Sequence, residues 1–167
     1  WQTEPPLLIA RGSPAAVVIG DAIYVLGGYT NVVGDGMMTA VLEKWRPNGE
    51  RELLASSNNM LFPVAHAFAT SVENRIYIAG GYTSESEGAR LQVYTIGRNI
   101  RTPGASMPEA RWGGSGMQVI NGDLWAIGGW TTVGVNDALP HAEIFIYNRK
   151  RNDWTVSRSE EHTSELQ

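Results

Sequence analysis

The feature that most constrains the fold of this chain is a segment that occurs three times, about 50 residues apart. The copies read GDAIYVLGGYT, ENRIYIAGGYT and NGDLWAIGGWT, at residues 20–30, 73–83 and 121–131. In each copy an apolar, aromatic-containing run leads into a pair of glycines, and an aromatic residue and a threonine follow. A period of this length is typical of an architecture built from stacked copies of one small unit.

Each repeat contains the pattern of four antiparallel strands. An apolar run such as residues 15–19 leads through a tight turn into the strand that ends at the glycine pair. After a polar loop comes a third strand, ending at Trp45, Tyr94 or Tyr147, and then an outer strand. We find no convincing helical period, so we predict an all-β fold. Near-continuous apolar strands are typical of sheets covered on both faces, so the repeats must pack against one another.

This pattern resembles the kelch repeat, which forms one blade of a β-propeller. The resemblance rests on the three glycine pairs in register, the aromatic residue after each pair and Trp154 in the last repeat. Residues 107–111 (MPEAR) match the link that joins the outer strand of one kelch blade to the inner strand of the next. The sequence departs from the family at Glu52 and Arg101, where a tryptophan is expected.

The resemblance implies a partial, open β-propeller of about three four-stranded antiparallel kelch blades. We predict blades at residues 6–57, 58–105 and 106–157, with residues 1–4 as the outer strand of a preceding blade. In an open arc the first and last blades each expose an apolar face larger than a soluble monomer usually tolerates. We therefore expect self-association through the open blade faces.

The composition argues against several functions. The net charge of −4 disfavours a nucleic-acid partner. Without cysteine, the chain can hold no disulfide, thiolate metal site or thiol nucleophile. The longest aliphatic run falls far short of the roughly 20 residues that a membrane-spanning helix needs. Outside the last ten residues the chain has two histidines, His66 and His141, too few for a typical three-ligand zinc site without carboxylate help. We expect no metal, no cofactor and no catalytic residue.

In kelch propellers, the loop after the glycine pair and the link into the innermost strand form the rim of the central channel, where ligands bind. The resemblance therefore implies a ligand-binding rim made of residues from these two segments. The candidates are Arg11, Ser13, Tyr29, Thr30, His66, Tyr82, Thr83, Arg111, Trp112, Trp130 and Thr131. Aromatic residues beside arginine suit acidic peptides or carboxylated sugars. A rim of capping and stacking residues that binds no ligand is the alternative.

Two classes of function remain. We favour a binding or scaffolding module that recognises a protein or carbohydrate ligand through one face of the propeller. The alternative is part of a kelch-type sugar-modifying enzyme, such as a sialic-acid mutarotase or epimerase, whose channel is lined by arginine and histidine. Arg11, Arg111 and His66 fit that channel only loosely. A copper radical oxidase is disfavoured because that family needs a Tyr–Cys crosslink and the chain has no cysteine.

The last ten residues, 158–167 (RSEEHTSELQ), resemble the in-frame translation of a sequencing adapter, and we interpret them as a non-native tail. Deleting them should leave the melting temperature unchanged within error, because a non-native tail makes few contacts with the fold. Thermal unfolding followed by circular dichroism measures this. A clear drop in the melting temperature would mean that the tail belongs to the folded protein.

Overall fold

The computed structural model describes residues 1, 3–30, 37–54, 60–83, 88–98, 100–113, 116–133 and 137–157. Within these ranges the chain forms strands β1 to β17 and no helix, as the sequence predicts. Twelve of the strands make three four-stranded antiparallel sheets, which we call blades 1, 2 and 3. The predicted tail at residues 158–167 lies outside the described residues.

The three blades share one strand order, from the inner edge to the outer edge. Blade 1 consists of β2 (Ala15–Ile19), β3 (Ala22–Leu26), β6 (Leu42–Trp45) and β7 (Arg51–Leu53). Blade 2 consists of β8 (Phe68–Val72), β9 (Arg75–Ala79), β10 (Leu91–Thr95) and β11 (Ile100–Gly104). Blade 3 consists of β12 (Met117–Ile120), β13 (Asp123–Ile127), β16 (Ile144–Asn148) and β17 (Asp153–Ser157).

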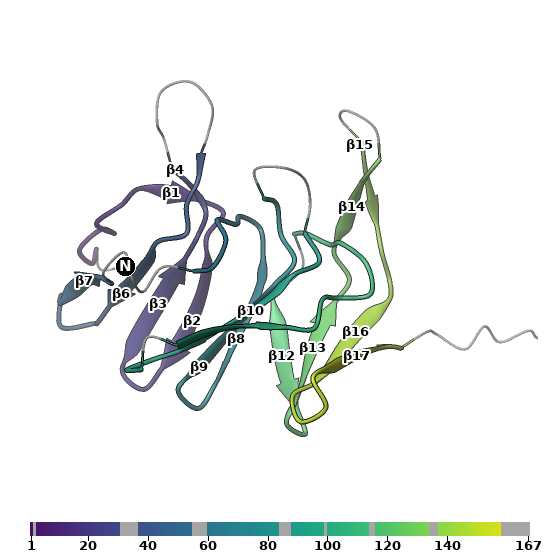
Figure 1. The fold of residues 1–167 in the computed structure, drawn as a ribbon. Coiled ribbons are helices and arrows are strands. Elements are labelled where there is room, and N and C mark those ends of the chain that lie inside the picture. Colours follow the sequence, from purple (N-terminus) through teal and green to yellow (C-terminus); the bar gives the residue numbers. More distant parts are fainter. Residues whose placement is uncertain are drawn as a thin grey trace, which may run out of the picture.

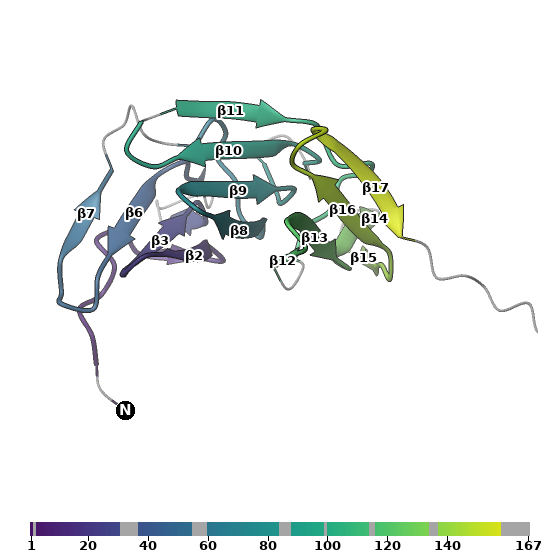
Figure 2. The same ribbon diagram turned by 90° about the horizontal axis from the view of Figure 1, so that it is seen from below.

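The blades stand side by side in an open arc, with β2, β8 and β12 along its inside and β7, β11 and β17 along its outside (Figure 2). This confirms the predicted all-β, partial and open propeller. The three sheets lie within the predicted blade ranges of residues 6–57, 58–105 and 106–157. Residue 1 and residues 3–4 carry no strand. Their assignment to a preceding blade, like the exact blade boundaries, stays a prediction.

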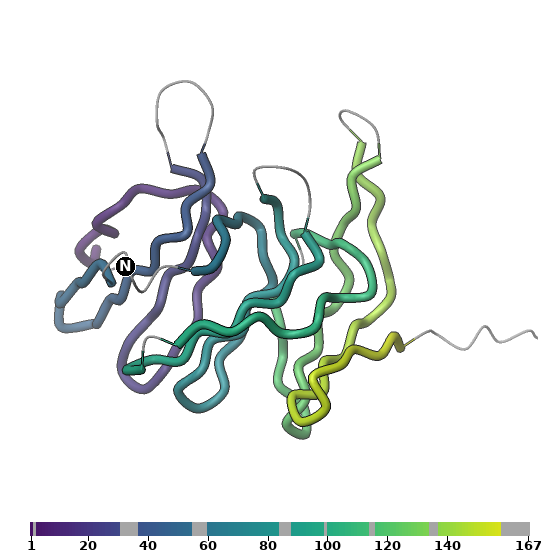
Figure 3. Tube along the Cα trace, in the orientation of Figure 1, coloured from purple at the N-terminus to yellow at the C-terminus, as the bar shows by residue number. Residues whose placement is uncertain are grey.

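Five short strands lie at one end of the blades, opposite the β2–β3 and β12–β13 turns (Figure 1); we call this end the loop face. These strands are β1 (Arg11–Gly12), β4 (Tyr29–Thr30), β5 (Met37–Met38), β14 (Trp130–Val133) and β15 (Asp137–Pro140). They form the sheets β1-β4-β5 and β14-β15. The Cα trace in the same orientation follows the chain through the three blades in turn (Figure 3).

The apolar core lies between the blades. In β9, Ile76 and Ile78 belong to a cluster shared with blade 1, whereas Tyr77 and Ala79 belong to a cluster shared with blade 3. All four side chains are at most 3% exposed. Since successive residues of a strand point to opposite faces, a strand covered on both sides must be apolar throughout. This explains the near-continuous apolar runs of the sequence.

At the glycine pairs the backbones of neighbouring blades are in direct contact. The main-chain N–H of Gly28 donates to the carbonyl of Val64 in blade 2 (2.8 Å), and that of Gly81 donates to the carbonyl of Arg111 in blade 3 (2.7 Å). A Cβ on the preceding glycine, Gly27 or Gly80, would overlap the same carbonyl. Both of these glycines also have positive φ, +61° and +63°. Glycine is therefore required here for space and for backbone conformation.

In blade 1, where the family tryptophan is missing, a tryptophan on the neighbouring strand makes an equivalent contact. In blade 3, Trp154 donates from Nε1 to the carbonyl of Ala105, at the start of the link (2.7 Å). In blade 1, Trp45 on β6 donates to the carbonyl of Pro5, at the start of its own link (3.2 Å). The link is thus anchored in both blades, although Glu52 occupies the expected tryptophan position in blade 1.

The glycine contact predicts different costs for two Gly→Ala substitutions. Gly97 has φ +78° and nothing within 4 Å of an added Cβ, so Gly97→Ala should cost about 1–2 kcal/mol of backbone strain alone. Gly80→Ala adds an overlap with the Arg111 carbonyl and should cost roughly 3 kcal/mol or more. Urea unfolding measures both free energies. Equal costs would show that the contact between blades 2 and 3 does not need glycine.

Candidate functional site

In every blade, main-chain pairing with the link holds an aromatic residue at the loop face. In blade 1, Tyr29 pairs with Gly12 across β1 and β4. In blade 2, the N–H of Tyr82 donates to the carbonyl of Ala65 (2.8 Å) and the reverse bond is also made (3.1 Å). In blade 3, Trp130 pairs with Trp112 in the same way. The residue after each glycine pair is therefore held by the link of its own blade.

A line of main-chain hydrogen bonds joins the innermost turns of the links. Ser13, His66 and Gly113 occupy this turn in blades 1, 2 and 3, all with positive φ (50°, 53° and 69°). The His66 N–H donates to the carbonyl of Ser13 (3.1 Å), and the Gly113 N–H donates to the carbonyl of His66 (2.9 Å). Positive φ is unfavourable for serine and histidine, and such strain is concentrated at functional sites.

Five rings on these segments form a continuous group that we call the aromatic row: Tyr29, His66, Tyr82, Trp112 and Trp130. The His66 ring lies edge-on to Tyr29 (5.7 Å between centroids) and to Trp112 (5.7 Å). Tyr82 and Trp112 are 4.9 Å apart, and Trp112 stacks on Trp130 at 6.2 Å. These are favourable separations for aromatic pairs. The row crosses all three blades, and Trp130 remains 38% exposed.

Arg11 lies inside blade 1 and not on the rim surface. Its side chain is 0% exposed, and Nη1 donates to the carbonyls of Gly27 (3.1 Å) and Val41 (3.0 Å). Nη2 lies 3.5 Å from the Glu43 carboxylate, which also accepts the N–H of Leu8 (2.6 Å). Burial lowers the pKa of Arg11, and Glu43 raises it. This arginine fastens the link of blade 1 to its sheet.

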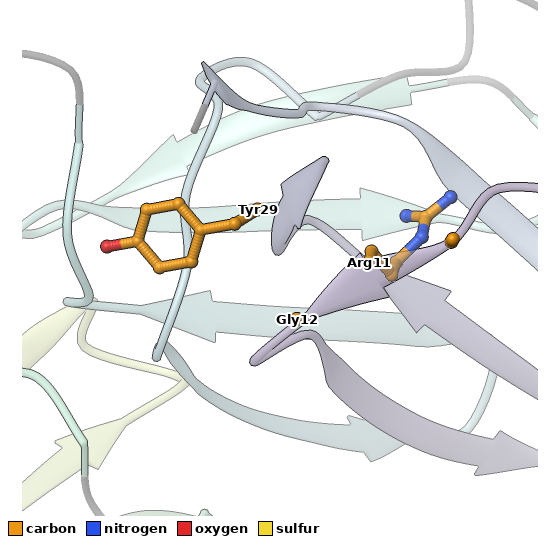
Figure 4. Close-up of a pocket in the computed structure, with 4 residues that line it drawn as sticks. Arg11, Gly12 and Tyr29 are labelled. Atoms are coloured by element: carbon orange, nitrogen blue, oxygen red, sulfur yellow. The ribbon is translucent and has the colours of Figure 1, made fainter. Parts of the chain in front are cut away.

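A shallow hollow of about 370 Å³ opens beside this link, lined by Ala10, Arg11, Gly12 and Tyr29. Figure 4 shows that the Tyr29 ring and the Arg11 guanidinium point in opposite directions. Because the guanidinium bonds to carbonyls of the sheet, the Tyr29 ring and the main chain are what this hollow offers to a ligand.

Arg111 takes the same position in blade 3 and is 1% exposed. Its Nη2 contacts the carboxylates of Glu109 (2.7 Å) and Glu143 (3.4 Å), and its guanidinium lies over Phe145, 5.0 Å from the ring centroid. Nε and Nη1 are buried and have no partner among the described residues. Blade 2 has Val64 at this position. The two arginines therefore belong to the blade interiors.

Glu143 is the centre of a small charged group in blade 3. Its carboxylate contacts Arg111 and lies 3.4 Å from Nδ1 of His141, whose Nε2 lies 2.8 Å from the Thr131 hydroxyl. A hydrogen bond from its own main-chain N–H is the largest cause that lowers the pKa of Glu143. Desolvation opposes this, and the charges of Arg111 and His141 lower the pKa further.

The remaining threonines of the predicted rim flank the aromatic row. The Thr30 hydroxyl donates to the carbonyl of Met37 (3.1 Å), Thr131 bonds to His141, and Thr83 is half-buried directly after Tyr82. The sequence did not predict one contact at this face. The Tyr82 hydroxyl lies 2.6 Å from the Thr132 hydroxyl, and this hydrogen bond joins blade 2 to β14 of blade 3. The role of Glu43 was not predicted either, because its strand reads LEKW and a carboxylate beside a lysine gives no sign of burial.

Two kinds of site can be checked across the part of the chain that the structure describes. It contains no group of three or more histidine, aspartate or glutamate side chains placed to hold a metal ion. In the same part, we find no helix long and apolar enough to cross a membrane.

Comparison with known proteins finds similarity to several Kelch-like proteins. No family model matches the sequence. The chain is 27% identical over 157 residues to Kelch-like protein 23 of Homo sapiens, covering 92% of this chain and 25% of that protein. It is 23% identical over 165 residues to Kelch-like protein 25 of Xenopus tropicalis, covering 93% and 26%. Kelch-like protein 36 of Bos taurus is 29% identical over 118 residues, 66% of this chain and 18% of that protein. The chain thus spans about a quarter, or less, of each of these relatives.

The lowered pKa of Glu143 predicts an acid-sensitive contribution to stability. A carboxylate whose pKa is lower in the folded than in the unfolded state stabilises the fold above the unfolded value, near 4.5. That stabilisation is lost as the pH falls through the folded value. The melting temperature of the parent chain should therefore fall more steeply between about pH 5 and pH 3 than that of Glu143→Gln. Parallel curves would contradict a stabilising role for this carboxylate.

Proposed function

Because this chain is a kelch-repeat protein, we propose that it is a binding module that takes a protein ligand on its loop face, with the aromatic row as the main contact surface. The observation that carries the proposal is the row itself, whose rings cross three blades without a break. Tyrosine and tryptophan are enriched among the residues that dominate binding energy at protein interfaces. Loops held by a rigid scaffold are where proteins most often place such residues.

Hydrogen bonds hold the segments that carry the aromatic row. Its segments are fixed by paired main-chain hydrogen bonds in blades 2 and 3, and Tyr82 is tied to Thr132. Ordering side chains on binding costs about 0.5–1.5 kcal/mol for each flexible group, so a surface ordered in advance avoids much of this cost. Aromatic rings also have few rotatable bonds for the area that they present.

The geometry favours a protein that presents apolar or aromatic side chains over an acidic peptide or a carboxylated sugar. Recognition of a carboxylate would use guanidinium groups on the rim. Those of Arg11 and Arg111 are buried and bonded within the blades. The same placement counts against the sugar-modifying alternative, which relied on Arg11 and Arg111, together with His66, to line a channel.

A peptide display library provides the test. Sequences selected on the parent chain should be rich in apolar and aromatic residues, and Trp130→Ala should weaken their binding at least about tenfold. Trp130→Phe should keep most of the affinity. Trp1→Ala is the matched control, because Trp1 is fully exposed and outside the loop face. Fluorescence anisotropy measures the dissociation constants. Equal binding to the parent chain and Trp130→Ala would overturn the proposal.

A further inference from the structure

In blades 1 and 2, the tyrosine after the glycine pair meets a ring from the link of the next blade. Between blades 1 and 2, Tyr29 lies 5.7 Å from His66, and between blades 2 and 3, Tyr82 lies 4.9 Å from Trp112. His66 also lies 6.3 Å from Tyr82, so the two pairs are in contact. This central part of the aromatic row is formed entirely by blades 1, 2 and 3.

The two tyrosines differ in how their hydroxyl groups are used. The Tyr82 hydroxyl is bonded to Thr132 of the next blade (2.6 Å). The Tyr29 hydroxyl and the ring nitrogens of His66 make no hydrogen bond within the part of the chain that the structure describes. Burial, and then the neighbouring Tyr82, raises the pKa of Tyr29, which keeps this hydroxyl protonated and able to donate. The row therefore offers hydrogen-bonding groups that the fold itself does not use.

An uncharged acceptor suits these groups better than an anion. The guanidinium groups of the two link arginines, Arg11 and Arg111, are buried, so they offer no charged contact to a carboxylate or phosphate. A neutral carbonyl oxygen, in contrast, accepts from the Tyr29 hydroxyl or from the N–H of a neutral His66 ring without needing a counter-charge. The ligand chemistry that this surface favours is thus apolar, with main-chain carbonyls facing the rings.

The main chain of the row is not open to strand addition at its tyrosines. Tyr29 pairs with Gly12 on one side and with Met38 on the other. Tyr82 exchanges two main-chain hydrogen bonds with Ala65. A peptide that adds as a β-strand binds to the unpaired main-chain groups of a sheet edge. Side chains, and not an edge, are therefore what this part of the row presents to a peptide.

We propose that the aromatic row binds a proline-rich segment in the polyproline II conformation. Such a segment has no internal hydrogen bonds, so its carbonyls are free to accept, and proline has no N–H that needs an acceptor. Aromatic-lined surfaces recognise segments of this kind. Successive rings between Tyr29 and Trp130 are 5.7, 5.7 and 6.2 Å apart, a length that about six residues cover at roughly 3.1 Å each. This inference rests on the proposed function of the loop face and names its class of ligand.

Decaproline provides a direct test, with its mirror image as the control peptide. Fluorescein-labelled L-decaproline forms the left-handed polyproline II helix, whereas D-decaproline has the same composition and the opposite hand. The L-peptide should bind the full chain at least about tenfold more tightly than the D-peptide, as measured by fluorescence anisotropy. Equal affinities would mean that the row does not recognise this helix. That result, or the absence of binding by both peptides, overturns the inference.

Tyr29→Phe tests the unused donor, because it keeps the ring and removes only the hydroxyl. It should weaken L-decaproline binding by about threefold to tenfold, as expected for one neutral hydrogen bond. Tyr94→Phe is the matched control: Tyr94 is 3% exposed on β10, away from the loop face, and this variant should bind like the parent chain. Unchanged binding to Tyr29→Phe, or an equal loss in both variants, contradicts the proposed contact. Circular dichroism checks that both variants fold.

The peptide display library separates this inference from the proposed function. Selected peptides that are rich in proline and lose affinity for Trp130→Ala support both. Selected peptides without proline that still lose affinity for Trp130→Ala overturn the polyproline II inference and leave the proposed function in place. Selected peptides that bind Trp130→Ala as tightly as the parent chain overturn both.

Discussion

The hydrogen bond from the second glycine of each pair to the link carbonyl of the next blade is the contact on which the rest of the structure depends. At Gly28–Val64 and Gly81–Arg111 it brings two backbones so close that no Cβ fits on the preceding glycine. It sets where one blade lies on the next, and it marks the point where the chain turns toward the loop face. A side chain here would separate the blades and displace the aromatic residue that follows the pair.

The overall architecture was predictable because this contact leaves a local signature in the sequence. Glycine pairs in register, an apolar run before each and a tight turn before that run were enough to predict the strands, their antiparallel order and an open arc of blades.

The roles of the rim residues were less predictable, because they depend on side-chain direction and on partners far away in the sequence. Arg11 and Arg111 lie in the links, as predicted, but their guanidinium groups point inward to carbonyls and carboxylates. The partner of Arg11 is Glu43, which lies on β6, far along the sequence beyond the loop. No local motif marks it. The convergence of His66 with Tyr29 and Trp112 likewise requires the stacking of three blades.

Stability and the loop face are therefore coupled through the same backbone contacts. His66 touches rings from both neighbouring blades, and its main chain bonds to Ser13 on one side and Gly113 on the other. Each blade supplies rings to the aromatic row, but their spacing is set by the contact between blades and not by any one loop. A change that loosens this contact should widen the row even when every aromatic residue is retained. The surface offered to a ligand is thus a property of the stacked blades rather than of any single repeat.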